Sequence, residues 1–115
     1  MDEKYAAIAR TLIRARALIA LEDRWIRGRF ACTDRGTSVD ATNPKAVCFC
    51  MLGALQHVTN SRHKYETAEY DAAEFLMRRT VLATLAWWND QTGRTHAEVL
   101  AAFSRAIASL GATDG

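Results

Sequence analysis

Three residues of this chain have the types that could carry covalent chemistry: Cys50, His96 and Asn89. If the fold brought them together, they would supply the nucleophile, the base and the orienting amide of a cysteine hydrolase. A position in the first two turns of a helix would lower the thiol pKa of Cys50, as a nucleophile or redox sensor requires. His57 would lie about 10 Å further along that helix, so only His96 or His63 could be the base. Because free cysteine is among the most buried residue types, we interpret Cys50 as a packed, inert thiol and keep the catalytic set as the alternative.

Metal binding is the second possibility, since the same region carries Cys48, Cys50, His57 and His63, with Cys32 nearby. Structural zinc sites favour cysteine pairs with two residues between them. Residues two apart on a helix point to nearly opposite sides, so Cys48 and Cys50 could share a metal only if the helix started later. The sequence therefore predicts no metal, and it indicates no other cofactor.

Small side chains gather on one side of the segment around Cys50. They either let a second helix approach closely or leave a groove for a ligand, and close packing is the default because protein interiors contain few voids. These small residues are Ala46, Cys50, Gly53 and Ala54.

The stretch from Trp87 to Gly93 predicts a turn, because Asn89 and Asp90 can bond to nearby backbone groups. In this interpretation Asn89 and Asp90 close the turn, while Trp87 and Trp88 anchor it in the core. The alternative is a ligand or partner groove beside the turn, lined by Trp25, Gly53, Trp88 and Asp90.

Basic residues near the tryptophans raise the question of nucleic-acid binding. The net charge is only +2 and the isoelectric point 8.6, below the value above about 9 that is typical of a nucleic-acid-binding domain. No recognised reading motif accompanies these cations, so the sequence gives no strong nucleic-acid signal. They are Arg62, Lys64, Arg78, Arg79, Arg94 and Arg105.

The element that must position these residues is a helix predicted over 43–58, the one segment that is apolar on all sides. Asn43 suits the N-cap, and Pro44 suits the first helical position because it has no N–H to leave unpaired. We expect this helix to be central, with protein neighbours on every side.

Three further helices are expected around it. The spacing of Tyr5, Ile8, Leu12, Ala15 and Ile19 predicts a helix from Glu3 to about 23, with Arg10 and Arg14 on the solvent side. A second helix is expected from Lys64 to about 79, and both a continuation to Ala86 and a break near Thr80 remain open. The apolar residues at helical spacing in it are Tyr65, Ala68, Ala72, Phe75 and Leu76. Thr95 and Glu98 form a capping-box pattern for the last helix, whose apolar face is Val99, Phe103, Ala106 and Leu110 and which Gly111 ends.

The stretch from Trp25 to Asp40 has a different character, with aromatic and β-favouring residues around an Asp34-Arg35-Gly36 turn. It predicts a small β-hairpin, or else an irregular insert, packed on the helices because a lone hairpin is marginal in water. The resulting fold class is mainly α: a compact single-domain bundle of about four helices with this insert between the first two.

Length and composition support one domain over residues 1–115, with a frayed tail at 112–115. Hydrophobic residues make up 50% and charged residues 24%, as in ordinary globular proteins. No apolar run reaches the roughly 20 residues of a membrane span, the opening Met1-Asp2-Glu3 is unlike a signal peptide, and the cysteine count is odd. We therefore expect a cytoplasmic protein with reduced thiols, no membrane contact, and a monomeric or homodimeric state.

Three marks occur in fixed order: W-I-R-G-R-F before the turn, C-M-L-G-A-L in the central segment, and W-N-D-Q-T-G-R-T-H-A-E-V-L before the last helix. Together they resemble an uncharacterised bacterial and phage protein family marked by C-x-L-G-A-L and W-N-D motifs, over residues from Tyr5 to Ile107. The resemblance implies a small, mainly helical fold and no established activity. The matching positions are Trp25, Cys50, Gly53, Ala54, Leu55, Trp88, Asn89 and Asp90.

Two functional hypotheses follow. The first is a non-catalytic binding or accessory protein of phage or mobile-element origin, acting on a protein partner through a surface near the W-N-D turn. The second is a cysteine-dependent hydrolase or redox protein that uses Cys50 with His96 and Asn89.

Overall fold

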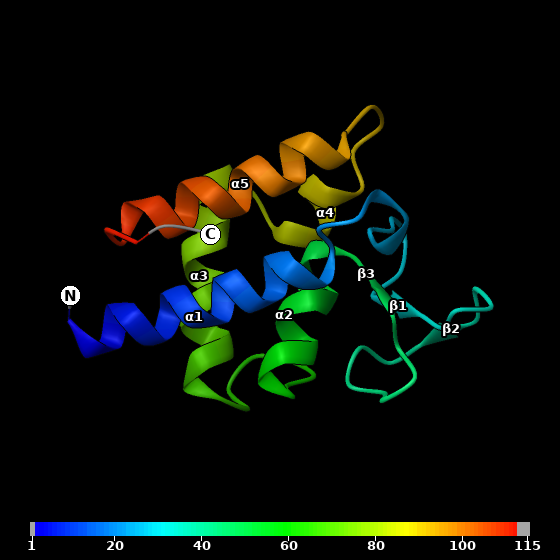
Figure 1. Cartoon of the computed structure of the whole chain (residues 1–115), viewed down its shortest axis with the longest axis horizontal. Coiled ribbons are helices and arrows are strands. Elements are labelled where there is room, and N and C mark those ends of the chain that lie inside the picture. The colour runs from blue at the N-terminus through cyan, green and yellow to red at the C-terminus, as the bar shows by residue number, and fades with distance from the viewer. Residues whose placement is uncertain (1, 113–115) are drawn as a thin grey trace.

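Five α-helices and a three-stranded antiparallel sheet make up the described part of the chain, residues 2–112, in a computed structural model (Figure 1). In chain order the elements are α1 (Glu3–Leu18), the 3-10 turn η1 (Glu22–Arg24), β1 (Ala31–Cys32), β2 (Ser38–Val39), β3 (Cys48–Phe49), α2 (Met51–Thr59), α3 (Ala68–Val81), α4 (Leu85–Asn89) and α5 (His96–Ser109). The fold is therefore mainly helical with a small sheet between the first two helices, as predicted.

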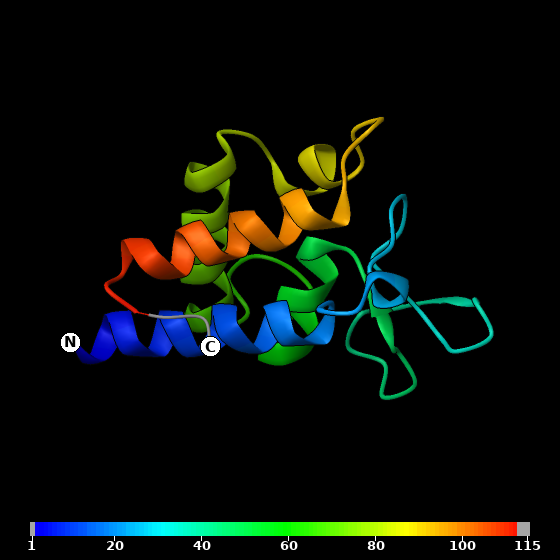
Figure 2. The ribbon, with the colours of Figure 1, turned by 45° about the horizontal axis from the view of Figure 1, so that its top comes forward.

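The helices α1 and α5 run side by side in opposite directions, and α3 crosses behind them (Figures 1 and 2). The helix α2 contacts α1, α3, α4 and β3, which gives it the central place that the sequence predicted. The sheet lies at the end of the molecule opposite the start of α1 (Figure 2). The core between the helices contains Leu12, Met51, Leu55, Met77 and Phe103, all without solvent exposure.

The helix predicted over 43–58, with Pro44 as its first residue, begins seven residues later than expected, at Met51. Asn43 closes a turn, where its side chain accepts a hydrogen bond from the Lys45 N–H, so it does not cap a helix. Cys48 and Phe49 instead pair with β1, since the backbone N–H of Cys50 donates to the carbonyl of Phe30 at 3.1 Å. Pairing with a distant strand thus outweighed the local helix signal.

The hairpin predicted between 25 and 40 is confirmed, with Ala31 opposite Val39 and Cys32 opposite Ser38. Its other edge pairs with β3, giving the strand order β2-β1-β3. This third strand supplies the packing that a lone hairpin lacks.

The open boundary after α3 is a break. The helix starts at Ala68, because Thr67 caps it by accepting a hydrogen bond from the Tyr70 N–H. It ends at Val81, after which Leu82 takes the left-handed conformation with φ 59°. The short helix α4 follows, so the continuous helix to Ala86 does not form.

The last helix is capped as predicted. Thr95 accepts a hydrogen bond from the Glu98 N–H at 3.1 Å, and Glu98 accepts one from the Thr95 N–H at 2.9 Å. The hydrogen bonds that the Glu98 carboxylate accepts from the Thr95 N–H and the Thr95 hydroxyl hold the pKa of this carboxyl below its ordinary value. The first helix is shorter than expected and ends at Leu18; its face carries the buried Leu12 and Ala15, whereas Tyr5 is 50% exposed.

None of the helices within residues 2–112 combines the length and apolar character needed to cross a bilayer. The predicted frayed tail at 112–115 falls outside the described residues, apart from Ala112.

Candidate functional site

The side chain of Asn89 joins three separate segments of the chain. It is fully buried, and its Oδ1 accepts hydrogen bonds from Trp25 Nε1 at 2.7 Å and from the Met51 N–H at 3.1 Å. Its Nδ2 donates to the carbonyl of Ile26 at 3.1 Å and to Asp90 Oδ1 at 2.9 Å. Both donor hydrogens and both acceptor sites of the amide are therefore used within the fold.

Asp90 extends this junction to the loop before β1. Its Oδ1 accepts a hydrogen bond from the Gly28 N–H at 2.9 Å, and Gly28 has the left-handed φ of 81°. Arg27 connects the same two segments, because its guanidinium donates to the carbonyl of Gln91 and lies 5.2 Å from the centre of the Trp25 ring. The W-N-D turn is thus fastened to residues 25–28, a contact that the sequence alone did not reveal.

The turn predicted over 87–93 begins only after Asn89, because Trp87 and Trp88 lie in the short helix α4, and the two tryptophans differ in their exposure. Trp88 is partly buried, and the Arg94 guanidinium lies over its ring at 3.6 Å from the centroid while donating to the Trp88 carbonyl at 2.9 Å. Trp87 is 60% exposed, so the prediction that both tryptophans anchor the turn in the core is wrong for Trp87.

Gly53 lies at a close contact between α2 and the loop before β1. A Cβ atom built on Gly53 would come 2.0 Å from the carbonyl oxygen of Phe30, well inside van der Waals contact. Ala54 on the same helix is fully buried and Ala46 nearly so. The small residues here fit close packing, as the sequence interpretation favoured.

Cys50 is the N-cap of α2 and is 3% exposed. Its Sγ accepts a hydrogen bond from the Gly53 N–H at 3.3 Å. Burial raises the pKa of this thiol to about 11, and the hydrogen bonds from Gly53 and Leu52 only partly offset that effect. The lowered thiol pKa expected from the helix terminus is therefore wrong, because desolvation outweighs the helix N-terminus.

The three histidines bond to backbone carbonyls or to a carboxylate. His96 Nε2 lies 2.6 Å from the carbonyl oxygen of Ile19, and His57 Nδ1 lies 2.7 Å from that of Ala41. His63 pairs with Glu66 at 3.1 Å. Within residues 2–112, none of the three is hydrogen-bonded to the thiol of Cys50.

The predicted catalytic residues are brought into one region through Trp25. The Trp25 ring lies 6.1 Å from that of His96, its Nε1 donates to Asn89, and Asn89 in turn accepts from Met51, the residue after Cys50. The amide of Asn89 thus orients Trp25 and the start of α2, and His96 is held by Ile19. These contacts fit a role of Asn89 and His96 in packing better than a role in proton transfer.

Cys32 and Cys48 face each other across β1 and β3. Burial and the neighbouring Cys32 thiol raise the pKa of Cys48 to about 11. In the described part of the chain, no three His, Cys, Asp or Glu side chains are grouped as a metal site would require.

One open surface feature was not predicted from the sequence. A groove of about 870 Å³ runs between the start of α1, the outer side of α3 and the end of α5, and we call it the α1–α3 groove. Tyr5 and Phe75, which helical spacing assigned to buried faces, line it and are 50% and 52% exposed. Its apolar floor also includes Ile8, Ala72, Leu76 and Leu110.

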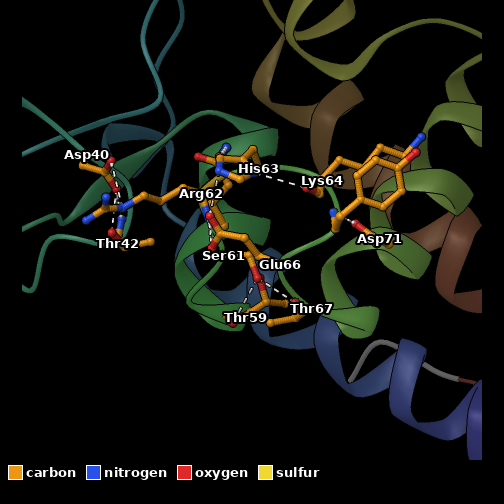
Figure 3. Close-up of polar contacts among 12 residues, drawn as sticks. Asp40, Thr42, Thr59, Ser61, Arg62, His63, Lys64, Glu66, Thr67 and Asp71 are labelled. Atoms are coloured by element: carbon orange, nitrogen blue, oxygen red, sulfur yellow. Dashed lines mark hydrogen bonds and ion pairs between the residues drawn. The ribbon is translucent and has the colours of Figure 1, made fainter.

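The loop between α2 and α3 forms one rim of the groove (Figure 3). Ser61 is buried and its hydroxyl lies 2.6 Å from that of Thr67, while the Arg62 N–H donates to Glu66. The N–H of Tyr65 donates to Asp71 Oδ1 at 3.0 Å. These bonds fix the loop on both sides of Tyr65.

Tyr65 itself has a φ of 75° and a side chain that is 84% exposed. The left-handed region is unfavourable for a residue with a Cβ by about 1–2 kcal/mol. The loop therefore holds an aromatic ring at the rim of the groove at a conformational cost, with Lys64 5.5 Å from that ring.

Together, the fold and these contacts define a small, mainly helical domain whose W-N-D turn is a buried structural junction and whose open groove lies elsewhere. Residues 4–109 match the Family of unknown function (DUF6197), and the chain belongs to that family. This agrees with the resemblance to an uncharacterised family drawn from its sequence motifs. No curated protein and no solved structure matches the chain.

Proposed function

We propose that this protein is a non-catalytic binding protein and that the α1–α3 groove is its contact surface. The observation that carries the proposal is an open apolar groove with Tyr5, Tyr65 and Phe75 exposed around it. A cleft of several hundred Å³ lined mainly by apolar and aromatic side chains is typical of a binding site. The proposal moves the binding surface away from the W-N-D turn, because Asn89 and Asp90 are occupied by contacts within the fold.

The alternative from the sequence is a cysteine-dependent hydrolase or redox protein that uses Cys50, His96 and Asn89. It needs a thiolate that solvent can reach. With a pKa of about 11, the Cys50 thiol carries about 100-fold less thiolate near neutral pH than a thiol with the ordinary value of 9.0. The burial of Cys50 and the absence, within residues 2–112, of a histidine bonded to it support a packing role.

We also propose that the protein works in the cytoplasm, where its three free thiols would remain reduced. The family resemblance supports an origin in a bacterium, a phage or another mobile element.

The first test is the alkylation of Cys50 by iodoacetamide, followed by peptide mass spectrometry. The proposal expects labelling in the folded protein to be at least 100-fold slower than in urea. Fast labelling of Cys50 in the folded protein would favour the cysteine-dependent alternative.

The second test asks whether the groove takes a ligand, with the fluorescent apolar anion bis-ANS as probe. Wild-type protein is expected to bind it saturably, and Phe75→Ser is expected to remove most of that binding. Trp87→Ser is the matched control, because Trp87 is a similarly exposed aromatic residue that does not line the groove. Equal binding by wild type and Phe75→Ser would count against the groove as a contact surface.

A further inference from the structure

The charges around the α1–α3 groove are unbalanced. Four cationic side chains and one carboxylate line it. The carboxylate, Asp71, already accepts a hydrogen bond from the Tyr65 N–H at the rim. A second carboxylate, Glu69, lines a smaller hollow of about 140 Å³ that adjoins the groove. The four cations are Lys4, Lys64, Arg78 and Arg79.

Most of these cations have no carboxylate partner among residues 2–112. Arg78 forms an ion pair with Glu74, one turn earlier on α3. Lys4, Lys64 and Arg79 form no ion pair with a described residue, and all three are exposed. An incoming anionic group could therefore pair with them without breaking an ion pair of the folded chain.

Three of the cations lie close to aromatic rings of the groove. The Arg78 and Arg79 guanidinium groups lie 5.5 Å and 5.8 Å from the centre of the Phe75 ring, and Lys64 lies 5.5 Å from that of Tyr65. Lys64 lies in the loop between α2 and α3, three residues before the N-cap Thr67 (Figure 3). The ligand-facing surface is thus an apolar floor with positive charge at its edges.

This arrangement fits a protein segment better than a nucleic acid. Beside its aromatic rings, the floor includes aliphatic and alanine side chains such as Ile8, Ala72 and Leu76, which can bury leucine or phenylalanine anchors and give bases no ring to stack on. Because helices and a loop form the groove, it offers no free strand edge to pair with an extended backbone. A helical segment meets this condition, since its backbone hydrogen bonds are internal.

A second copy of the chain placed symmetrically on the groove would be disfavoured. In a two-fold dimer the same patch meets itself, so Lys64 and Arg79 of one protomer would approach the same cations of the other. An acidic partner removes this repulsion and balances the charge.

We propose that the α1–α3 groove binds an acidic amphipathic helix of a partner protein, with apolar anchors on its floor and carboxylates paired to Lys4, Lys64 and Arg79. The inference rests on the proposed function and adds the chemistry of the partner.

The experiment selects peptides from a randomised 16-residue phage-displayed library on the immobilised full-length protein. Selected peptides are expected to combine glutamate or aspartate with apolar residues at helical spacing, and to bind more weakly as salt is raised. Affinity is then measured by fluorescence anisotropy for wild type and for three variants, with circular dichroism confirming that each is folded.

The charge-reversed variant Lys64→Glu/Arg79→Glu is expected to bind the selected peptides at least tenfold more weakly than wild type. The matched control is Arg14→Glu/Arg35→Glu, which makes the same change in net charge at exposed positions outside the groove. This control is expected to stay within twofold of wild type. Phe75→Ser tests the groove itself, because it removes part of the apolar floor without changing the charge.

The outcomes separate the inference from the proposed function. Peptides that Phe75→Ser weakens, but that are not acidic or are insensitive to Lys64→Glu/Arg79→Glu, would overturn the acidic partner and leave the groove as a binding site. Groove-dependent binding of a single-stranded dT12 oligonucleotide in the absence of peptide binding would overturn it in favour of nucleic acid. Failure to obtain any ligand whose binding depends on Phe75 would overturn both the acidic partner and the groove as a binding site.

Discussion

Replacing Asn89 with alanine removes four hydrogen bonds at once and tests whether the W-N-D turn is a structural junction. The change leaves Trp25 Nε1, the Met51 N–H and the Ile26 carbonyl without their partner. At about 1 kcal/mol for each orphaned group, we expect the free energy of unfolding to fall by about 3 kcal/mol. That is a large fraction of the 5–15 kcal/mol typical of a domain.

The assay is urea unfolding, followed by far-UV circular dichroism and by tryptophan fluorescence. The midpoint should fall while the slope with urea concentration stays unchanged, because the same surface is exposed on unfolding. Gln91→Ala is the matched control. The Gln91 side chain donates one hydrogen bond, to the Trp87 carbonyl, and this bond is exposed to solvent. Its loss should lower the free energy of unfolding by less than about 0.5 kcal/mol.

Asn89→Asp separates hydrogen bonding from volume. Aspartate keeps nearly the same shape and an acceptor for Trp25, but it cannot donate to Ile26 and places a carboxylate against Asp90 Oδ1, 2.9 Å from the present nitrogen. We expect it to destabilise the fold as clearly as alanine does. If both Asn89 variants lowered the free energy of unfolding by less than about 1 kcal/mol, the junction would be incidental to stability.

Three further changes test other features of the fold. Gly53→Ala should lower the free energy of unfolding by about 1–3 kcal/mol, and with it the urea midpoint, because the added Cβ would overlap the Phe30 carbonyl. An unchanged midpoint would mean that the contact between α2 and Phe30 relaxes freely. Leu82→Gly should raise the free energy of unfolding by about 1 kcal/mol, and with it the thermal midpoint, since glycine adopts the φ of 59° without strain and the leucine side chain is 87% exposed. A lower midpoint would show that the leucine side chain makes a stabilising contact. Glu98 has a lowered pKa, so its contribution to the stability of the fold is present above the ordinary pKa of 4.5 and is lost as the pH falls through the pKa of the folded state. During an acid titration followed by circular dichroism, Glu98→Gln should therefore lose less stability than wild type. Identical acid profiles would contradict this.

The helices with strong local signals were predicted well from the sequence. The capping box of Thr95 and Glu98 and the apolar spacing of Val99, Phe103 and Ala106 describe α5 as it forms. Such signals are local, so neighbouring residues are enough to read them. The hairpin was also predicted, because its turn residues lie between its two strands.

The central segment shows where local reading fails. Residues Cys48 and Phe49 sit in a stretch with helical composition, yet they pair with Ala31 and Cys32, more than fifteen positions earlier. Cys50 then becomes a buried N-cap, and its thiol pKa rises where the predicted helix would have lowered it. The chemistry of that cysteine depended on a tertiary contact that its own neighbours in sequence do not encode.

The candidate groove was missed for a related reason. Helical spacing groups Phe75 with Ala72 and Leu76, whereas the face that α3 buries carries Tyr70, Ala73 and Met77. Spacing shows which residues share a face. It does not show whether a third element covers that face. The left-handed Tyr65 at the rim also has no signature in its own residue type, because its conformation follows from the bonds of the loop around it.

The contacts of Asn89 also set an order of events for folding. Trp25 and Met51, which bond to the amide, lie 64 and 38 positions before Asn89 in the chain, so each of these bonds can form only after a long loop has closed. Local pieces such as α1, α5 and the hairpin can assemble before that. The junction is then completed after the rate-limiting barrier, and stopped-flow kinetics on Asn89→Ala should show faster unfolding with little change in the refolding rate.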